Sequence, residues 1–299
     1  MKAALLPDRG VVKVAGDGAR NFLHGLLSTD ILQLAPSAAR FAALLTPQGK
    51  IIADFLVAEA PQQDGGGFFL DLPRVLGKPV VDKLNLYKLR ARVMVEDLSE
   101  TLGVLAAWDG PVMPDTAPGG LCYADPRLPA LGLRVMLPPQ RAAAVAASLG
   151  AALVDAGHYD AHRIALGIPQ GGVDFAYGDA FPHEADMDQF GGVDFAKGCY
   201  VGQEVVSRME HRGIARTRAV PVRYGGAAPA AGVAVTANER QVGTMGSAAA
   251  GHGIALLRLD RVAEALSRGE PLLAGGIPIR LVKPDWVHFT FPEDAKAAE

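Results

Sequence analysis

The sequence contains few cysteines. Among its 299 residues only Cys122 and Cys199 carry a thiol. Iron–sulfur clusters are usually held by four thiolates, so one copy of this chain does not have enough of them. Small secreted domains contain several disulfides, and two cysteines in a chain of this length do not form such a framework. The cysteine count therefore excludes a disulfide scaffold and a cluster held by one chain alone.

Long apolar runs are also missing. The first residues, MKAALLPDRG, break at Pro7 before an apolar core of signal-peptide length develops. No later run approaches the ~20 apolar residues that span a bilayer. We therefore expect a soluble, cytoplasmic protein that has no membrane partner.

Neither an excess of positive charge nor many aromatic residues is present. The chain carries 29 Lys and Arg against 32 Asp and Glu, and aromatic residues make up 6% of it. This balance argues against direct nucleic-acid binding, which depends on phosphate contacts and base stacking. A local basic cluster nevertheless follows residue 207, and it consists of Arg208, Arg212, Arg216, Arg218 and Arg223.

The composition and the order of the apolar patterns predict a folded α+β protein. Apolar residues make up 49% of the chain and charged residues 20%. Strand-like and helix-like segments alternate over the first 100 residues, which is typical of one sheet with helices on a face. Residues 17–27 predict a helix with Asp17 as a possible N-cap. Residues 73–90 predict another, whose apolar face would contain Val75, Leu76, Val80, Leu84 and Leu86.

The stretch from 181 to 213 combines Gly, Asp, His and Arg with Cys199. A helix is predicted to begin around Tyr200–Gly202 and to end at Gly213. The helix dipole and the ammonium of Lys197 would both favour a thiolate at Cys199. We hypothesise that Cys199 is a reactive or ligand-forming thiolate, and the alternative is a small buried hydrophobic residue. Cys122 lacks this setting and is interpreted as structural.

The octapeptide KGCYVGQE (197–204) resembles the signature of the YgfZ family of folate-binding proteins, relatives of the glycine cleavage T-protein. The match covers all eight positions. Other segments similar to this superfamily are NFLHGLLSTDI (21–31), LLTPQGKIIADFLV (44–57), DPRLPALGLR (125–134), RIALGIPQ (163–170) and FPHEADMDQFGG (181–192).

The resemblance implies a three-domain α+β ring around a central folate-binding channel. The N-terminal α+β domain would span residues 1–100. A middle α+β domain, 101–213, would interleave with it and carry the signature. The residues after Gly213 show short strand-like runs with one helix at about 260–268, so 214–299 are expected to form a C-terminal β-barrel.

The resemblance also implies a site for tetrahydrofolate or a derivative. A reduced pterin presents two adjacent N–H donors, which a carboxylate accepts bidentately. Glu184 is the first candidate, because related folate proteins place an acid here, and the alternative is a solvated loop residue. The carboxylates of the folate tail call for an Arg, either Arg212 or Arg216. Further cofactor-binding candidates within the signature are Gly198, Tyr200 and Gln203.

The catalytic candidates are Cys199, Lys197 and Glu204. Glu204 would orient or deprotonate the thiol, or it is an ordinary acid in the first turn of a helix. Lys197 would tune the thiolate or face solvent. The histidines His158, His162 and His183 have no regular ligand spacing, so we predict no metal site.

One departure from the T-protein decides the expected chemistry. That enzyme uses an aspartate to transfer a one-carbon unit. The corresponding segment, LDLPRVLGKPVVDKL (70–84), places Gly77–Lys78 near this position, with no acid until Asp82. Without that carboxylate the proton transfer has no agent, so we do not expect a classical aminomethyltransferase.

The resemblance therefore implies a folate-binding accessory protein in iron–sulfur cluster assembly or repair. Its partners would be folate and cluster assembly or client proteins, and the enzymes served would include some that modify tRNA. The alternative is a folate-dependent one-carbon (aminomethyl) transferase. Direct tRNA binding through the Arg cluster is a third function, against which the net charge of −3 argues.

Overall fold

The computed structural model describes residues 1–110, 120–213 and 215–292. Contacts divide the chain into two compact units. Unit 1 consists of Met1–Tyr159 and Phe190–Gln203, and unit 2 consists of Asp160–Gln189 and Glu204–Glu299. The division into three domains stays a prediction, and its boundary touches residue 214, which lies outside the described residues.

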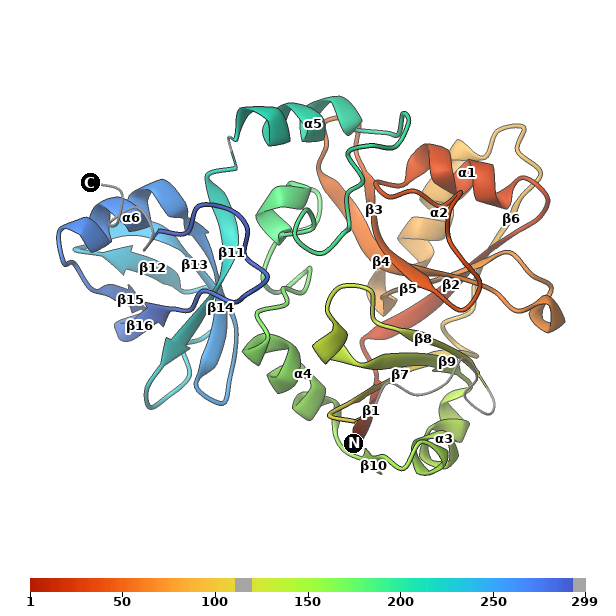
Figure 1. Ribbon diagram of the computed structural model, residues 1–299, viewed down its shortest axis with the longest axis horizontal. Helices are drawn as coiled ribbons and strands as arrows, with labels where there is room; N and C mark the ends of the chain where they lie inside the picture. Colours follow the sequence, from red (N-terminus) through yellow and green to blue (C-terminus); the bar gives the residue numbers. More distant parts are fainter. Residues whose placement is uncertain (111–119, 214, 293–299) are drawn as a thin grey trace. The chain divides into compact units, whose positions relative to one another are not determined.

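Unit 1 contains two five-stranded sheets (Figure 1). The first has the order β3-β4-β5-β2-β6, with the strands Ala39–Leu45, Ile51–Glu59, Phe68–Pro73, Arg9–Ala15 and Met94–Asp97. The second has the order β10-β1-β7-β9-β8, with the strands Ala152–Leu153, Lys2–Leu6, Gly103–Trp108, Leu133–Leu137 and Leu121–Ala124. The α+β class predicted from the alternating patterns is confirmed.

Two helices cover one face of the first sheet. Helix α1 (Ala19–Leu26) buries Leu23, and α2 (Gly77–Tyr87) buries Val80 and Leu84 against β2–β5. The predicted apolar face of α2 was partly wrong. Leu86 is two residues from Leu84, so it lies about 200° around the helix and points to solvent. Val75 lies before α2, in the 3₁₀ turn η2 (Arg74–Leu76), and is also exposed.

The N-terminus of α1 differs from the prediction as well. The residue at the cap position is Gly18, and no side chain bonds to the free N–H groups of the first turn. Asp17 is therefore not the N-cap. Gly16 has a φ of +113°, a conformation that glycine adopts without strain, and it lies in the turn that leads from β2 into α1.

A buried polar network joins the two sheets. Asp71 on β5 accepts hydrogen bonds from Arg134 on β9 (2.8 Å), from Tyr123 on β8 (3.0 Å) and from Arg9. The other carboxylate of the network, Asp125, accepts from Arg134 at 2.9 Å and from a neighbouring Arg. Alternate residues of β5 pack under the helices, so Asp71 points from the opposite face towards the second sheet.

Helix α3 (Ala142–Ser148) packs against the second sheet.

Electrostatics in this network favour the ionised carboxylates. Burial alone would raise the pKa of Asp71, but the guanidinium groups of Arg9 and Arg134 lower it below its usual value. Burial opposes ionisation of Asp125 in the same way, and Arg127 and Arg134 lower its pKa. The segment DPRLPALGLR thus contains three members of the network, Asp125, Arg127 and Arg134, and Arg134 connects them to the distant residue Asp71.

Unit 2 contains a closed barrel in the order β11-β14-β13-β12-β15-β16 (blue in Figure 1). The strands are Thr217–Tyr224, His252–Arg258, Arg240–Ala249, Ala234–Ala237, Leu272–Ala274 and Ile277–Leu281. Helix α6 (Leu259–Ser267) packs on the barrel core through Val262 and Ala265. The C-terminal barrel and its helix are confirmed, while the short strand β15 was not predicted.

Two further helices complete the chain. They are α4 (Ala156–Ala165) and α5 (Gln203–Arg212), and each contains a boundary between the units. Short 3₁₀ turns occur at Gln62–Asp64, Arg74–Leu76, Pro129–Leu131, Pro139–Arg141 and Pro182–Ala185. Within residues 1–110, 120–213 and 215–292, no helix combines the length and the apolar character needed to cross a membrane.

We predict that Arg134→Met lowers the free energy of unfolding by about 3–5 kcal/mol at pH 7, because buried Asp71 and Asp125 lose a shared cation. Arg240→Met, which removes an exposed ion pair with Glu264, should cost under about 1 kcal/mol. Urea unfolding measures both values. Equal costs for the two variants would contradict the role given to the network.

The same network predicts a pH dependence. The pKa values of Asp71 and Asp125 are lower in the folded chain than their ordinary value of 3.8. Their stabilisation is therefore complete above that value and is lost as the pH falls through the folded pKa values. The difference in unfolding free energy between the parent and Arg134→Met should shrink below pH 3.8. A difference in unfolding free energy that stays constant down to pH 2 would contradict this prediction.

Candidate functional site

The loop that carries Cys199 is attached to Ser28 of unit 1 by hydrogen bonds, and Ser28 is itself bound to Ala43. The Ser28 hydroxyl donates to the carbonyl of Gly192 at 2.5 Å and accepts the N–H of Ala43. The N–H of Asp194 donates to the carbonyl of Ser28 at 2.9 Å. The Asp194 carboxylate in turn accepts the N–H groups of residues 196 and 197. The loop therefore starts from a fixed backbone position.

Lys197 provides a further attachment through three hydrogen bonds. Its Nζ donates to the carbonyls of His24 (2.7 Å), Leu27 (2.6 Å) and Thr29 (3.0 Å), at the end of α1 and just beyond it. An ammonium has three N–H donors, so these bonds use all of them. Burial lowers the pKa of Lys197 to about 8, and the nearby carboxylates of Asp30 and Asp194 act in the opposite direction.

These bonds change the interpretation of Lys197. It was predicted to tune the Cys199 thiolate or to face solvent. Its side chain is buried, and its N–H groups are bound to backbone carbonyls. Any action on the thiolate must therefore come from its charge and not from a hydrogen bond. The acceptors lie about 170 positions away in the sequence, so no local pattern could have identified them.

The residues after Cys199 are also fixed. The ring of Tyr200 is buried and lies 5.0 Å from the Lys197 Nζ. Burial raises the pKa of Tyr200 to about 12, and its hydroxyl has no hydrogen-bond partner among the described residues. Gly202 has a φ of +84°, and a Cβ there would come within 2.5 Å of the Thr46 carbonyl oxygen. At Gly198 a Cβ would meet no atom within 4 Å, so the loop backbone does not require glycine there.

Cys199 is exposed on this fixed loop, whereas Cys122 is buried. Burial raises the pKa of Cys122 to about 11, as expected for a structural thiol. The interpretation of Cys199 as a small buried residue is therefore wrong. Helix α5 begins at Gln203, slightly later than predicted, so Cys199 precedes its first turn. Gly213, with a φ of +56°, follows the last residue of α5 as predicted.

Glu204 lies in the first turn of α5. Its side chain is 84% exposed and accepts a hydrogen bond from Arg208 at 2.7 Å. This is the arrangement of an ordinary surface ion pair on a helix. The role of Glu204 in orienting the thiol stays a prediction, as does the ligand role of Gln203 at the start of the same helix.

Two of the predicted folate residues meet in unit 2. Glu184 and Arg216 line a pocket of about 340 Å³ together with Arg258. Apolar side chains from Phe181, Val205 and Met209 also contribute to its lining. Thr217 pairs with Arg258 in the β11–β14 ladder, which brings Arg216 to the same end of the barrel. Glu184 accepts the N–H of Phe181 at 2.9 Å and so closes the turn η5 (Pro182–Ala185).

The other members of the predicted set lie elsewhere. Arg212 ends α5 and is not among the residues that line this pocket. Gly198, Tyr200 and Gln203 belong to unit 1. Arg216 thus lines this pocket and Arg212 does not, while a folate role for either residue stays a prediction.

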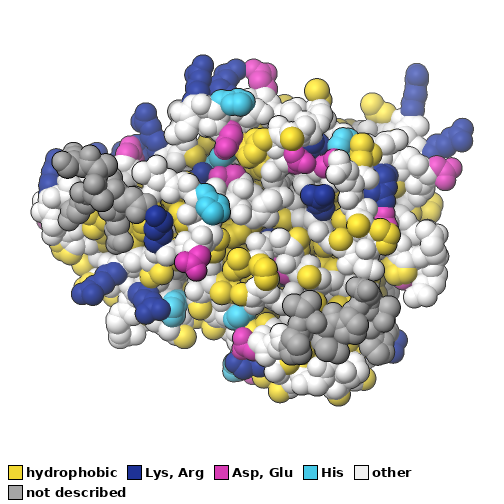
Figure 2. Space-filling view, in the orientation of Figure 1, with side chains coloured by type: hydrophobic (Ala, Val, Ile, Leu, Met, Phe, Trp, Pro, Cys, Tyr) yellow, Lys and Arg dark blue, Asp and Glu magenta, His cyan; other side chains and the backbone are white. Residues whose placement is uncertain are grey.

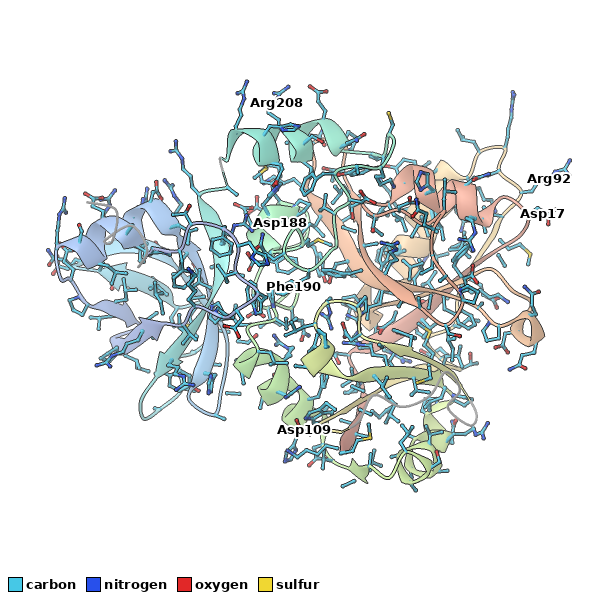
Figure 3. The ribbon with its side chains drawn as sticks, in the orientation of Figure 1. Asp17, Arg92, Asp109, Asp188, Phe190 and Arg208 are labelled. Carbon is cyan, nitrogen blue, oxygen red and sulfur yellow. The ribbon has the colours of Figure 1, made fainter. Side chains whose placement is uncertain are left out.

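Arg218 has a structural position that the Arg cluster did not indicate. It is buried and donates to both oxygens of Asp188, at 2.7 and 2.9 Å, and to Asp186 at 3.2 Å. Burial raises the pKa of Asp186 well above its usual range, although Arg218 opposes this shift. His183 is buried beside this group, and its Nε2 lies 3.0 Å from Glu210 on α5. Figure 3 labels Asp188 and, in unit 1, Phe190.

His183, Asp188 and Glu210 offer ligand-type atoms that lie within 4.8 Å of one another. Such a set is able to hold a cation in principle. Both oxygens of Asp188 are, however, bound to the guanidinium of Arg218. We therefore interpret the group as an ion-pair network that attaches α5 and η5 to β11.

Comparisons with known proteins agree with this architecture. Residues 216–289 match the family described as "CAF17, C-terminal beta-barrel domain". The glycine cleavage system aminomethyltransferase T from Bartonella henselae has a similar structure over 97% of this chain and 87% of its own, with a TM-score of 0.76 and 15% identity. The predicted T-protein-like fold is thereby confirmed.

Sequence relatives give a more specific result. The iron–sulfur cluster assembly factor IBA57 of Mus musculus is 33% identical over 94% of this chain and 84% of its own length. The IBA57 homolog of Mycosarcoma maydis is 36% identical over 75% of this chain. The chain spans little more than half of that fungal relative, 57% of its length.

The cytoplasmic location predicted above is contradicted, because both of these relatives are named as mitochondrial proteins. The prediction came from missing apolar segments. Such segments would direct a chain into or across a membrane by the secretory route. Their absence does not distinguish the cytoplasm from the interior of an organelle.

We predict that Lys197→Met releases the Cys199 loop. Three buried carbonyls would lose their donor, which should lower the free energy of unfolding by about 3 kcal/mol. Hydrogen exchange of residues 194–202 should accelerate relative to β2–β5. Lys2→Met, at an exposed ion pair, is the matched control and should leave that exchange unchanged. Unchanged exchange in Lys197→Met would refute the attachment.

Proposed function

Because the chain belongs to the family of the IBA57 iron–sulfur cluster assembly factors, we propose that it acts in the assembly or repair of iron–sulfur clusters. The observation that carries the proposal is the single exposed thiol, Cys199, on a loop fixed by Lys197. The resemblance of residues 197–204 to the YgfZ signature supports the same role. The clients would be cluster-dependent enzymes, including some that modify tRNA.

The cysteine count defines what one chain contributes. A cluster usually takes four thiolates, and Cys122 is buried, so this chain supplies one ligand through Cys199. The remaining ligands must come from a partner protein or a second copy. The cluster is therefore cargo shared across an interface and not a resident group.

Binding of the cluster is a ligand exchange. The Cys199 thiol releases its proton to solvent, and its sulfur forms one bond to iron. One thiolate of the donor protein leaves the same iron and takes up a proton from solvent. No electron is transferred, so the step requires no oxidant or reductant. A fixed loop favours this exchange because the sulfur does not have to be ordered when the partner arrives.

We predict that Cys199→Ala abolishes the function while the fold is retained. In cells that lack this factor, the parent chain should restore the activity of a cluster-dependent enzyme, and Cys199→Ala should not. Cys122→Ala is the matched control and should restore it, provided that its expression is equal. Full restoration by Cys199→Ala would remove the thiol from the mechanism.

Tetrahydrofolate, or a derivative of it, is the proposed cofactor. The pocket of about 340 Å³ in unit 2 fits part of such a molecule, because small-molecule sites begin at about 300 Å³. Glu184 offers a carboxylate for the pterin N–H groups, and Arg216 offers donors for a carboxylate of the tail. When bound, the folate supplies a one-carbon carrier, while these residues bind and orient it.

We predict that Arg216→Met weakens tetrahydrofolate binding about tenfold in a calorimetric titration, the effect of losing one charge-assisted hydrogen bond. Glu184→Gln should weaken it to a similar extent. Arg212→Met is the matched control, since Arg212 does not line the pocket, and it should bind within a factor of about two of the parent. Failure of the parent chain to bind, or a larger loss in Arg212→Met, would contradict the folate assignment.

A further inference from the structure

The end of α2 and the segment that follows it expose large apolar side chains. Leu86 is 65% exposed, Leu89 is 89% exposed and Met94, the first residue of β6, is 72% exposed. Exposed apolar residues that are grouped within a few positions mark interaction surfaces more often than single ones do. Residues 86–94 are called the α2–β6 loop below; they comprise the last two residues of α2, the connection and the first residue of β6, and all of them belong to unit 1.

Positive charge is interleaved with these apolar residues. Between Lys83 and Val95 the chain carries four cations and no Asp or Glu, although its overall net charge is −3. Three of the cations lie in the loop itself: Lys88, Arg90 and Arg92. Figure 2 shows Lys and Arg side chains projecting from the edge of unit 1 at which Figure 3 labels Arg92.

The loop is held in place by its backbone. The carbonyl oxygen of Arg92 lies so close to Gly16 that a Cβ there would come within 2.4 Å of it. Met94 pairs with Ala15 in the β2–β6 ladder. Leu89 has a φ of +37°, which a residue with a Cβ adopts only when its surroundings enforce it. The exposed leucine is thus presented in a fixed and mildly strained conformation.

Helix α1 connects this loop to the Cys199 loop. Gly16 and Gly18, which the α2–β6 loop contacts, directly precede α1, and the carbonyls that bind Lys197 lie at its other end. Eight residues of helix measure about 12 Å. A protein interface covers about 800 Å² on each partner, so one partner is able to cover both loops.

We propose that the α2–β6 loop is the docking surface for the protein that shares the cluster with Cys199, and that this protein presents carboxylates around an apolar patch. Leu86, Leu89 and Met94 would enter the apolar patch, while Lys88, Arg90 and Arg92 pair with the carboxylates. The proposal rests on the proposed cluster role of Cys199 and adds the surface that brings the cluster to it.

Two other classes of partner agree less well with the loop. An anionic membrane would gain little from the loop, because the aliphatic side chains of Leu86, Leu89 and Met94 give only weak insertion. A nucleic acid would require exposed rings for stacking, but the ring of Tyr87 is partly buried and lies 5.2 Å from the Lys83 ammonium. The mixture of aliphatic and basic side chains favours a protein.

The test compares Leu89→Asp and Arg90→Glu/Arg92→Glu with the control Val75→Asp, which changes an equally exposed apolar residue at the far end of α2. Each full-length variant is assayed in two ways. The first is the activity of a cluster-dependent enzyme in cells that lack the parent. The second is uptake by the purified chain of a [2Fe–2S] cluster held by glutathione, which requires no protein partner.

We expect Leu89→Asp and Arg90→Glu/Arg92→Glu to lower the cellular enzyme activity about tenfold, the effect of losing one interface hot spot. Val75→Asp should remain within a factor of about two. All three should take up the glutathione-held cluster as the parent does. Parental activity of Leu89→Asp in cells would overturn the docking proposal, and so would its failure to take up the glutathione-held cluster.

Cys199→Ala separates this proposal from the one on which it rests. If Cys199→Ala loses both activities while Leu89→Asp loses neither, the cluster role is retained and the docking surface is wrong. If Cys199→Ala behaves as the parent in both assays, the cluster role itself fails. The parent chain is also tested for binding to vesicles with 30% anionic lipid and to tRNA. If either binds and Arg90→Glu/Arg92→Glu abolishes this binding, the partner of the loop is a membrane or an RNA and not a protein.

A photoreactive side chain at position 89 tests the contact directly. In intact cells it should crosslink to a cluster-carrying protein, at a peptide rich in Asp or Glu, and Arg90→Glu/Arg92→Glu should remove the product. The same side chain at position 75 should give no such product. Crosslinks that are equal at both positions, or that persist in the charge-reversed variant, would contradict the docking surface.

Discussion

The ammonium of Lys197, bound by three backbone carbonyls, is the interaction on which the candidate site depends. These carbonyls lie at the end of α1 and just beyond it, and the lysine lies two residues before Cys199. One side chain thus joins segments that are about 170 positions apart in the sequence. A buried charge is costly unless it is fully hydrogen-bonded, so this arrangement permits few alternative positions of the loop.

Helix α1 in turn depends on the layers beneath it. Its buried side chains pack on the first sheet of unit 1, and the opposite face of that sheet is joined to the second sheet by Asp71 and Arg134. The polar network, the helix and the cysteine loop therefore form a continuous support. Cys199, exposed at the end of this support, is accessible to a partner although Lys197 and Tyr200 are buried.

Local patterns predicted much of this arrangement. Helix α5 and its end at Gly213, the C-terminal strands and the prominence of Cys199 all follow from residues that are close in the sequence. Contacts between distant segments were not predictable in this way. Arg218 belongs by sequence to an exposed basic cluster, yet its partners Asp186 and Asp188 bury it. Leu86 was assigned to the apolar face of α2 because it is apolar and close to Leu84 in the sequence. Two residues along a helix point to nearly opposite sides, so Leu86 is exposed while Leu84 is buried.

The central claim is that Cys199 binds iron in a cluster shared with a partner. The rate of alkylation of Cys199 in the cluster-loaded complex, compared with the chain treated with a chelator, tests it most directly. A sulfur bound to iron is not a free nucleophile, so loading should slow alkylation of Cys199 at least about tenfold. The rate at buried Cys122 should not change. Equal alkylation of Cys199 with and without the cluster would contradict the account.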